Sequence, residues 1–146
     1  MTGSQDHYTD GYVPFVLDVA TGRRRFIAPP TGVGPTFADG SLGVYLSGDG
    51  RHVAAAWRVG DLYYDIDRVV QISRLPDLRV EQVLTQDNTG LESLNGVAGI
   101  DHDGSHLLLG CMRRKPSPYF IPADLYRYNR QTGARTRVTV NSQGVP

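Results

Sequence analysis

The sequence predicts an all-β protein built from repeated four-stranded antiparallel sheets, and three observations support this fold class. Two Asp-Gly turn signals, Asp49-Gly50 and Asp103-Gly104, lie 54 residues apart, and an apolar run follows each of them. A second kind of turn, Thr21-Gly22 and Thr132-Gly133, recurs out of phase with the first. No segment has the long apolar stripe of 3.6-residue period that marks a helix. A repeat of this length indicates a stacked or radial arrangement of β units.

Composition supports one globular domain rather than a disordered chain. Of 146 residues, 40% are hydrophobic and 21% are charged, and 17 are glycine, as frequent turns require. The formal net charge is zero, so we expect no nucleic-acid partner and no broad attraction to anionic membranes. No apolar run reaches the roughly 18 residues of a membrane span, so no span is predicted in this chain.

The first two strands of each unit flank an Asp-Gly turn, which is a strong hairpin signal. We predict strands over 43–47 and 52–58 in one unit, and over 96–101 and 106–112 in the next. The second strand of each pair is continuously apolar, from Val53 to Trp57 and from Leu107 to Met112. Continuous apolar strands are typical of sheets that are buried on both faces.

The last two strands of each unit flank the second kind of turn. The predicted pairs are 12–19 with 23–28, 68–74 with 79–84, and 124–129 with 135–140. Segment 16–23 aligns with 127–134, and 71–78 is placed in the same slot, which makes Leu17, Ile72 and Tyr128 equivalent. These hairpins carry more charge than the Asp-Gly pairs, so we expect them to be the outer strands of each unit.

The turn from Ser47 to Ala54 resembles the Ser-Pro-Asp-Gly turn of TolB-like and related WD-like bacterial β-propeller repeats, and Asp103 begins a second copy. The segment from Asp18 to Arg23 is similar to the turn between the third and fourth strands of those repeats. Gly48 and His102 stand where the family has proline. The resemblance covers residues 12–140, and it implies propeller blades without naming a function.

This resemblance divides the chain into two and a half blades, which is an incomplete ring. We expect a flexible segment at 1–11, a half blade at 12–28, full blades at 43–84 and 96–140, and a tail at 141–146. Closed propellers have four to eight blades. One interpretation is a piece of a longer chain, and the other is a homo-oligomer that closes a ring from several copies.

Several residues of catalytic or metal-binding type occupy turn positions instead. Asp101 and Asp103 form an Asp-x-Asp-Gly run, but the distal carboxylate of a calcium loop does not follow. His52 and His106 fall in equivalent slots of the repeat, which favours a structural role. Cys111 is the single cysteine and lies in an apolar run, so we expect a buried thiol and no intrachain disulfide. We therefore predict no catalytic residue, no metal and no cofactor.

The predicted binding face is formed by two connectors, 58–67 and 113–123, which are longer than a hairpin needs. Both mix arginine with aromatic residues, a composition common at protein interfaces. Loops on a rigid scaffold often carry function, although such a loop can also be solvated with its aromatics packed on the blade edge. The candidate binding residues are Arg58, Asp61, Tyr63, Tyr64, Arg113, Arg114, Tyr119 and Phe120.

These observations favour a non-catalytic binding or protein-interaction module, whose partner is another protein or a small ligand. The alternative is the propeller portion of a larger hydrolase or lyase with catalytic residues outside this chain. A third possibility is a sensor ectodomain behind a membrane anchor. Residues 1–14 carry no signal-peptide pattern, so a cytoplasmic location is expected for the chain as given, and export only with an upstream signal.

Overall fold

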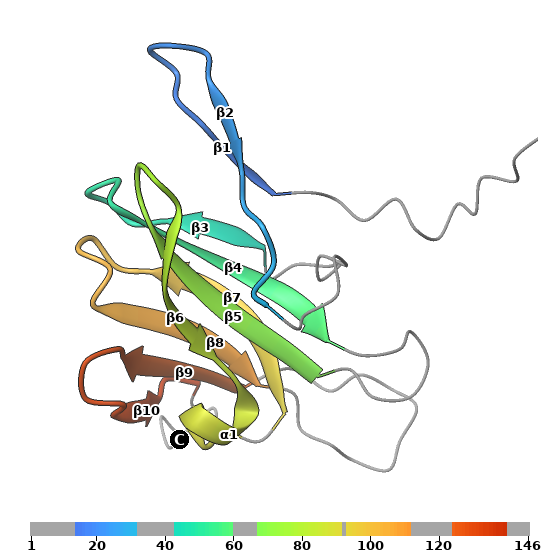
Figure 1. Cartoon of the computed structure of the whole chain (residues 1–146). Coiled ribbons are helices and arrows are strands. Elements are labelled where there is room, and N and C mark those ends of the chain that lie inside the picture. The colour runs from blue at the N-terminus through green and yellow to red at the C-terminus, as the bar shows by residue number, and fades with distance from the viewer. Residues whose placement is uncertain (1–13, 32–42, 60–66, 92, 112–123, 140–146) are drawn as a thin grey trace, which may run out of the picture.

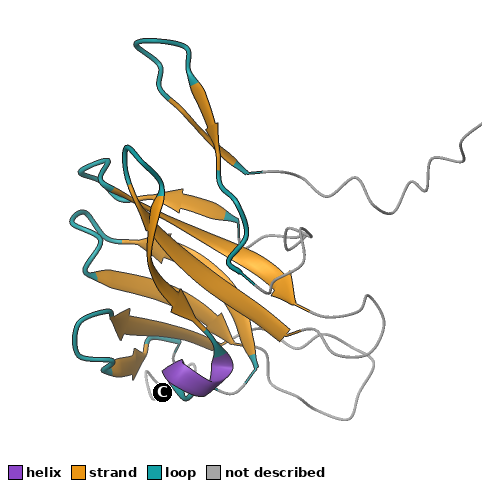
Figure 2. Ribbon diagram, in the orientation of Figure 1, coloured by secondary structure: helices purple, strands orange, loops and turns teal. Residues whose placement is uncertain are grey.

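The protein is all-β, as predicted, and its sheets are stacked in chain order. The computed structural model describes residues 14–31, 43–59, 67–91, 93–111 and 124–139. Within these ranges the chain forms three antiparallel sheets, none of them closed, and a helix of a single turn (Figure 2). Figure 1 shows the two-stranded sheet at one end of the stack, with the two four-stranded sheets following it.

Each predicted strand has a counterpart in the predicted order. The N-terminal hairpin consists of β1 (Phe15–Leu17) and β2 (Arg24–Phe26). The middle sheet consists of β3 (Val44–Leu46), β4 (His52–Val59), β5 (Asp67–Arg74) and β6 (Arg79–Leu84). The C-terminal sheet consists of β7 (Leu94–Ile100), β8 (His106–Cys111), β9 (Asp124–Asn129) and β10 (Arg135–Arg137). Within each sheet, neighbours in sequence are neighbours in space.

Two apolar cores hold the three sheets together. On β4, Val53, Ala55 and Trp57 face the core shared with the N-terminal hairpin, while Ala54 and Ala56 face the core shared with the C-terminal sheet. All five side chains are almost fully buried, which confirms the two-sided burial predicted for this strand. On β8 the prediction holds for one face only. Leu107, Leu109 and Cys111 are buried against the middle sheet, but Leu108 on the opposite face is partly exposed.

The turns at Thr21-Gly22 and Thr132-Gly133 are built in the same way. The Asp18 carboxylate accepts hydrogen bonds from the amides of residues 20 and 21, and Asn129 accepts the equivalent pair from residues 131 and 132. Each turn closes on a glycine with φ of 70°, the left-handed region that glycine adopts without steric cost. The alignment of 16–23 with 127–134 is therefore confirmed at the level of hydrogen bonds.

The equivalence proposed for Ile72 is wrong by one residue. Arg74 pairs with His52 just as Asn129 pairs with His106, so Ser73 is the counterpart of Tyr128. The left-handed turn position then falls on Leu78, whose φ is 57°. A leucine replaces the glycine that marks this position in the other two turns, which explains the misplaced alignment. The Leu78 side chain packs against the core beside the N-terminal hairpin, and this burial offsets the strain of its backbone.

The helix α1 (Gln86–Thr89) was not predicted, although its ends have recognisable signals. Thr85 and Asn88 form a capping box, and Gly90 ends the helix in a left-handed conformation. Arg135 of β10 donates a hydrogen bond to the carbonyl oxygen of Thr89 at 2.5 Å. A cation at a helix C-terminus is favourable, so α1 fastens the middle sheet to the edge of the C-terminal sheet.

Candidate functional site

Most of the predicted binding residues lie outside the described part of the chain. These are Asp61, Tyr63, Tyr64, Arg113, Arg114, Tyr119 and Phe120. Arg58 lies on β4, where its backbone is paired with that of Arg68. The strands that flank the two connectors are described, and β4–β5 and β8–β9 are the same pair of strands in their sheets. Because the sheets stack in the same orientation, the described strand ends that flank the two connectors lie at the same end of the stack (Figure 1).

The opposite end of the stack carries the two Asp-Gly turns, and these turns interlock. The amide of Asp49 donates a hydrogen bond to the carbonyl oxygen of His102 at 2.8 Å. The backbone of Gly48 lies directly against the His102 side chain, leaving no room for a Cβ atom. In the reciprocal contact, a Cβ on Gly104 would lie 2.6 Å from Nδ1 of His52. In each turn, therefore, a glycine packs against a histidine of the other turn: Gly48 against His102, and Gly104 against His52.

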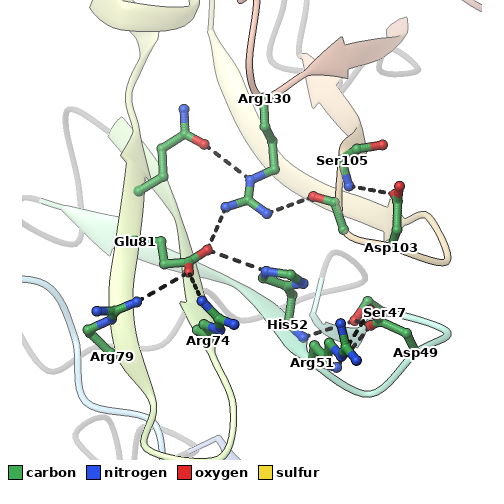
Figure 3. A network of polar contacts seen from close by, with 12 residues as sticks. Ser47, Asp49, Arg51, His52, Arg74, Arg79, Glu81, Asp103, Ser105 and Arg130 are labelled. Carbon is green, nitrogen blue, oxygen red and sulfur yellow. Dashed lines mark hydrogen bonds and ion pairs between the residues drawn. The ribbon is translucent and has the colours of Figure 1, made fainter.

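A charged cluster extends this contact between the sheets, as Figure 3 shows. Oε2 of Glu81 on β6 lies 3.4 Å from Nε2 of His52 and 3.1 Å from Nη2 of Arg130. Arg130, in the turn between β9 and β10, also donates to the Gln82 side chain and, at 2.6 Å, to the Gly104 carbonyl oxygen. The Arg130 side chain is only 12% exposed. One guanidinium thus bridges the middle and C-terminal sheets through three acceptors.

A shallow pocket of about 300 Å³ opens beside this cluster. Its wall contains His52, Glu81, Gln82, Asp103, Gly104, Ser105, Arg130 and Gln131. The Arg130 guanidinium is committed to protein acceptors, and Arg74 and Arg79 supply Glu81 with further positive charge at 4.0 and 3.8 Å. The cluster is therefore a charge-compensated joint between sheets rather than a set of groups poised for a ligand.

Sequence reasoning missed both members of the Glu81–Arg130 pair. They are 49 positions apart, and each lies in a hairpin that was predicted to be an exposed outer element. No short sequence motif predicts the contact between Glu81 and Arg130. The available signal was the equivalence of His52 and His106, which indicated that the turn ends of the two sheets are packed in a repeated way.

Ser105, His106 and Asp101 lie together but do not form a charge relay. Nδ1 of His106 lies 2.8 Å from the Ser105 hydroxyl oxygen and 2.9 Å from Oδ2 of Asp101, so both groups compete for the same nitrogen. A catalytic triad needs the serine on one ring nitrogen and the carboxylate on the other. Nε2 of His106 instead lies 3.1 Å from the Asn129 amide. These contacts stabilise the turn, as predicted for His106.

Hydrogen bonds in the two turns hold their carboxylates in the ionised form. The Ser47 hydroxyl and the Arg51 amide donate to Asp49 and lower its pKa below the usual range. Partial burial raises the pKa of Asp101, but hydrogen bonds from the backbone and ring of His106 and from Ser105 outweigh it, so the pKa is lowered overall. These carboxylates act as acceptors that order their turns.

Cys111 is a buried thiol, as the sequence predicted. Only 5% of the residue is exposed, within the core between the two four-stranded sheets. Burial, together with the nearby negative charge of Asp124, raises its pKa to about 11. A thiol that stays protonated at neutral pH is a poor nucleophile and a poor metal ligand.

The described residues include neither a metal-binding cluster nor a membrane-spanning helix. Across the described ranges, no three His, Cys, Asp or Glu side chains gather closely enough to hold a metal ion. No helix among the described residues is long and apolar enough to cross a membrane. Comparison with protein-family models and with curated proteins finds no match to this chain.

Proposed function

We propose that this chain is a non-catalytic binding or protein-interaction module of the β-propeller type, with blades like those of TolB-like repeats. The stacking of two four-stranded meander sheets in chain order supports the blade assignment. So does the interlocking of equivalent Asp-Gly turns, since it repeats the same contact between successive units. The described residues account for two such units and the outer half of a third.

The observation that carries the proposal is that the two ends of the stack differ: one holds the contacts between the sheets, and the other holds the ends of the strands that the two long connectors join. At one end, His52, Glu81 and Arg130 fasten the sheets together through charged contacts. At the other end lie the described strand ends between which the chain runs from β4 to β5 and from β8 to β9. Loops held on a rigid scaffold are suited to recognition, and these two connections contain arginine and aromatic residues.

The reactive side chains of the described region support a role without catalysis. His106 has contacts to both ring nitrogens, and Cys111 is buried with a raised pKa. Arg130 is committed to three protein acceptors. These three side chains, of types that commonly act as a base, a nucleophile or an anion binder, therefore have structural tasks here.

The proposal is tested by changing the predicted binding face and measuring capture of partners. Tyr63, Tyr64, Arg113 and Tyr119 are all replaced by alanine in the full chain, which is then immobilised beside the wild type in extract from the source cells. We expect mass spectrometry to find proteins or small molecules that the wild type retains and the variant loses. Circular dichroism checks that the variant folds.

A control variant carries alanine at Val19, Arg23 and Arg51, which are exposed at the turn end of the stack. It should retain the same partners as the wild type. If the two variants and the wild type retain identical sets, the loop face is not a recognition surface and the proposal fails.

A further inference from the structure

Exposed large apolar side chains are concentrated on two elements, the N-terminal hairpin and β3. Six of the eight exposed large apolar residues in the described ranges lie on the N-terminal hairpin and on β3. Val44 and Leu46 lie opposite Ala55 and Val53, so they point toward the N-terminal hairpin, and we define these two residues as the open face. Phe15, Leu17 and Phe26 lie on the other face of the hairpin, away from the middle sheet, because Val16 between them packs toward that sheet.

The hairpin also has a strand edge that pairs with no other described strand. Ile27 donates to the carbonyl oxygen of Pro14, and Asp18 donates to that of Arg23, so residues 14 and 18 point their backbone groups toward β2. Backbone groups alternate along an antiparallel strand, so Phe15 and Leu17 point theirs the other way. Among the described strands, none pairs with this edge of β1.

The C-terminal sheet shows what occupies the equivalent edge in a complete unit. Asn129 donates to the carbonyl oxygen of Ala134 just as Asp18 donates to that of Arg23, which makes Tyr126 and Tyr128 the counterparts of Phe15 and Leu17. These two residues of β9 pair with Leu109 and Leu107 of β8. The free edge of β1 is therefore the position at which an antiparallel inner strand adds.

The same repeat shows what covers the open face in a complete unit. Val44 lies opposite Ala55, and Val97 of β7 lies opposite Leu109, the residue equivalent to Ala55 in the repeat. Val97 is 0% exposed because the middle sheet covers it, whereas Val44 is 37% exposed. Leu46, 53% exposed, corresponds in the same way to Ile100, which packs into the core between the two four-stranded sheets.

We propose that the open face and the free edge of β1 form a docking site for a two-stranded β-hairpin supplied by another protein. One donated strand pairs antiparallel with β1, and the second lies over Val44 and Leu46. The donated hairpin is apolar on the side that meets β3, because the surface it covers is apolar. Strand addition of this kind gains backbone hydrogen bonds along the edge and side-chain burial on the face. The inference uses a surface separate from the loop face and does not depend on the proposed function.

The test uses a peptide copied from the chain as a probe. The probe is a cyclised synthetic peptide spanning residues 94–111, the inner strand pair that pairs with β9 in the C-terminal sheet. It is titrated into the full chain labelled with ¹⁵N, and hydrogen exchange is followed by NMR. We expect saturable binding that slows exchange of the Phe15 and Leu17 amides and shifts the signals of Val44 and Leu46.

Two proline variants separate edge pairing from nonspecific adhesion. Leu17→Pro removes the backbone amide of Leu17 from the free edge of β1. Arg24→Pro removes the amide of Arg24, which lies opposite Leu17 and points outward from the other edge of the hairpin, on β2. Because Leu17 and Arg24 occupy one register pair, each proline leaves the bonds between β1 and β2 in place. We expect about ten-fold weaker binding for Leu17→Pro and unchanged binding for Arg24→Pro.

Three results would overturn the proposal. One is equal binding of the probe by both proline variants, or no binding by the wild type. Another is protection of the Phe15 and Leu17 amides in the chain alone at low concentration, which would mean that the chain covers its own edge. The third is self-association in light scattering that Leu17→Pro abolishes, which would make a second copy the occupant.

Discussion

The interlocked turns predict that two similar glycine substitutions will have very different effects on stability. Gly104 and Gly50 are the glycines of the two Asp-Gly turns, with φ of 75° and 69°. A Cβ on Gly50 would have nothing within 4 Å, whereas one on Gly104 would lie 2.6 Å from Nδ1 and 2.8 Å from Cγ of His52. Gly50→Ala therefore isolates the backbone cost, and Gly104→Ala adds the contact between the sheets.

The expected magnitudes follow from these distances. An alanine in the left-handed region costs roughly 1–2 kcal/mol, and this applies to both variants. At Gly104 the His52 ring must also move away, although Glu81 holds its far side at 3.4 Å. Overpacking of this kind costs about 1–3 kcal/mol. We expect Gly50→Ala to lower the free energy of unfolding by about 1 kcal/mol and Gly104→Ala by about 3 kcal/mol.

Urea unfolding followed by tryptophan fluorescence measures both losses. Trp57 is the single tryptophan and is 1% exposed, so its emission reports loss of the core directly. A second change, His52→Ala in the Gly104→Ala background, removes the ring that the new methyl group meets and should recover part of the loss. Equal losses for Gly50→Ala and Gly104→Ala, with no recovery on truncating His52, would refute the interlock.

Three further predictions concern single side chains. Cys111 should react with a thiol reagent such as Ellman's reagent only on unfolding, since burial and a pKa near 11 keep it protonated; rapid modification of the native chain would contradict this. The lowered pKa of Asp101 gives stability that is fully present above about pH 4, its unfolded-state pKa, and is lost as pH falls through the folded value. Asp101→Asn should therefore reduce the fall in the free energy of unfolding as the pH is lowered below about 4. An unchanged dependence on pH would show that the hydrogen bonds to the Asp101 carboxylate do not contribute this stability. Arg130→Ala should lower the free energy of unfolding by about 2 kcal/mol, because it leaves partly buried acceptors unpaired. Arg79→Ala should lower it by less than about 0.5 kcal/mol, because the Arg79 side chain is 64% exposed. Equal effects of the two variants in thermal unfolding would argue against the bridge between sheets.

The strands and their order could be predicted because their signals are local. Asp-Gly and Thr-Gly turns fix where the chain reverses, and the apolar run from Val53 to Trp57 marks a strand with two buried faces. The one misplaced alignment arose where the local landmark is missing. Leu78 holds the left-handed turn position by packing its side chain into the core, which no pattern of turn residues reveals.

The contacts between sheets could not be predicted in the same way. Glu81 and Arg130 meet only because the turn ends of two sheets are superposed, and nothing near either residue encodes that distance. The repeat did predict that His52 and His106 are structural, yet it did not predict their different partners. His52 contacts Glu81 of its own sheet and Gly104 of the next sheet, whereas His106 bonds only within its own sheet, to Asp101 and Asn129.

The stacking of equivalent turns is the basis of the whole account, and a nuclear Overhauser spectrum of the labelled chain tests it most directly. The structure predicts cross-peaks from the Gly104 Hα protons to the His52 ring, and from the Gly48 Hα protons to the His102 ring. Both pairs join residues of different sheets across the same joint. Cross-peaks confined to each turn, with neither pair present, would show that the two sheets are not stacked in this register.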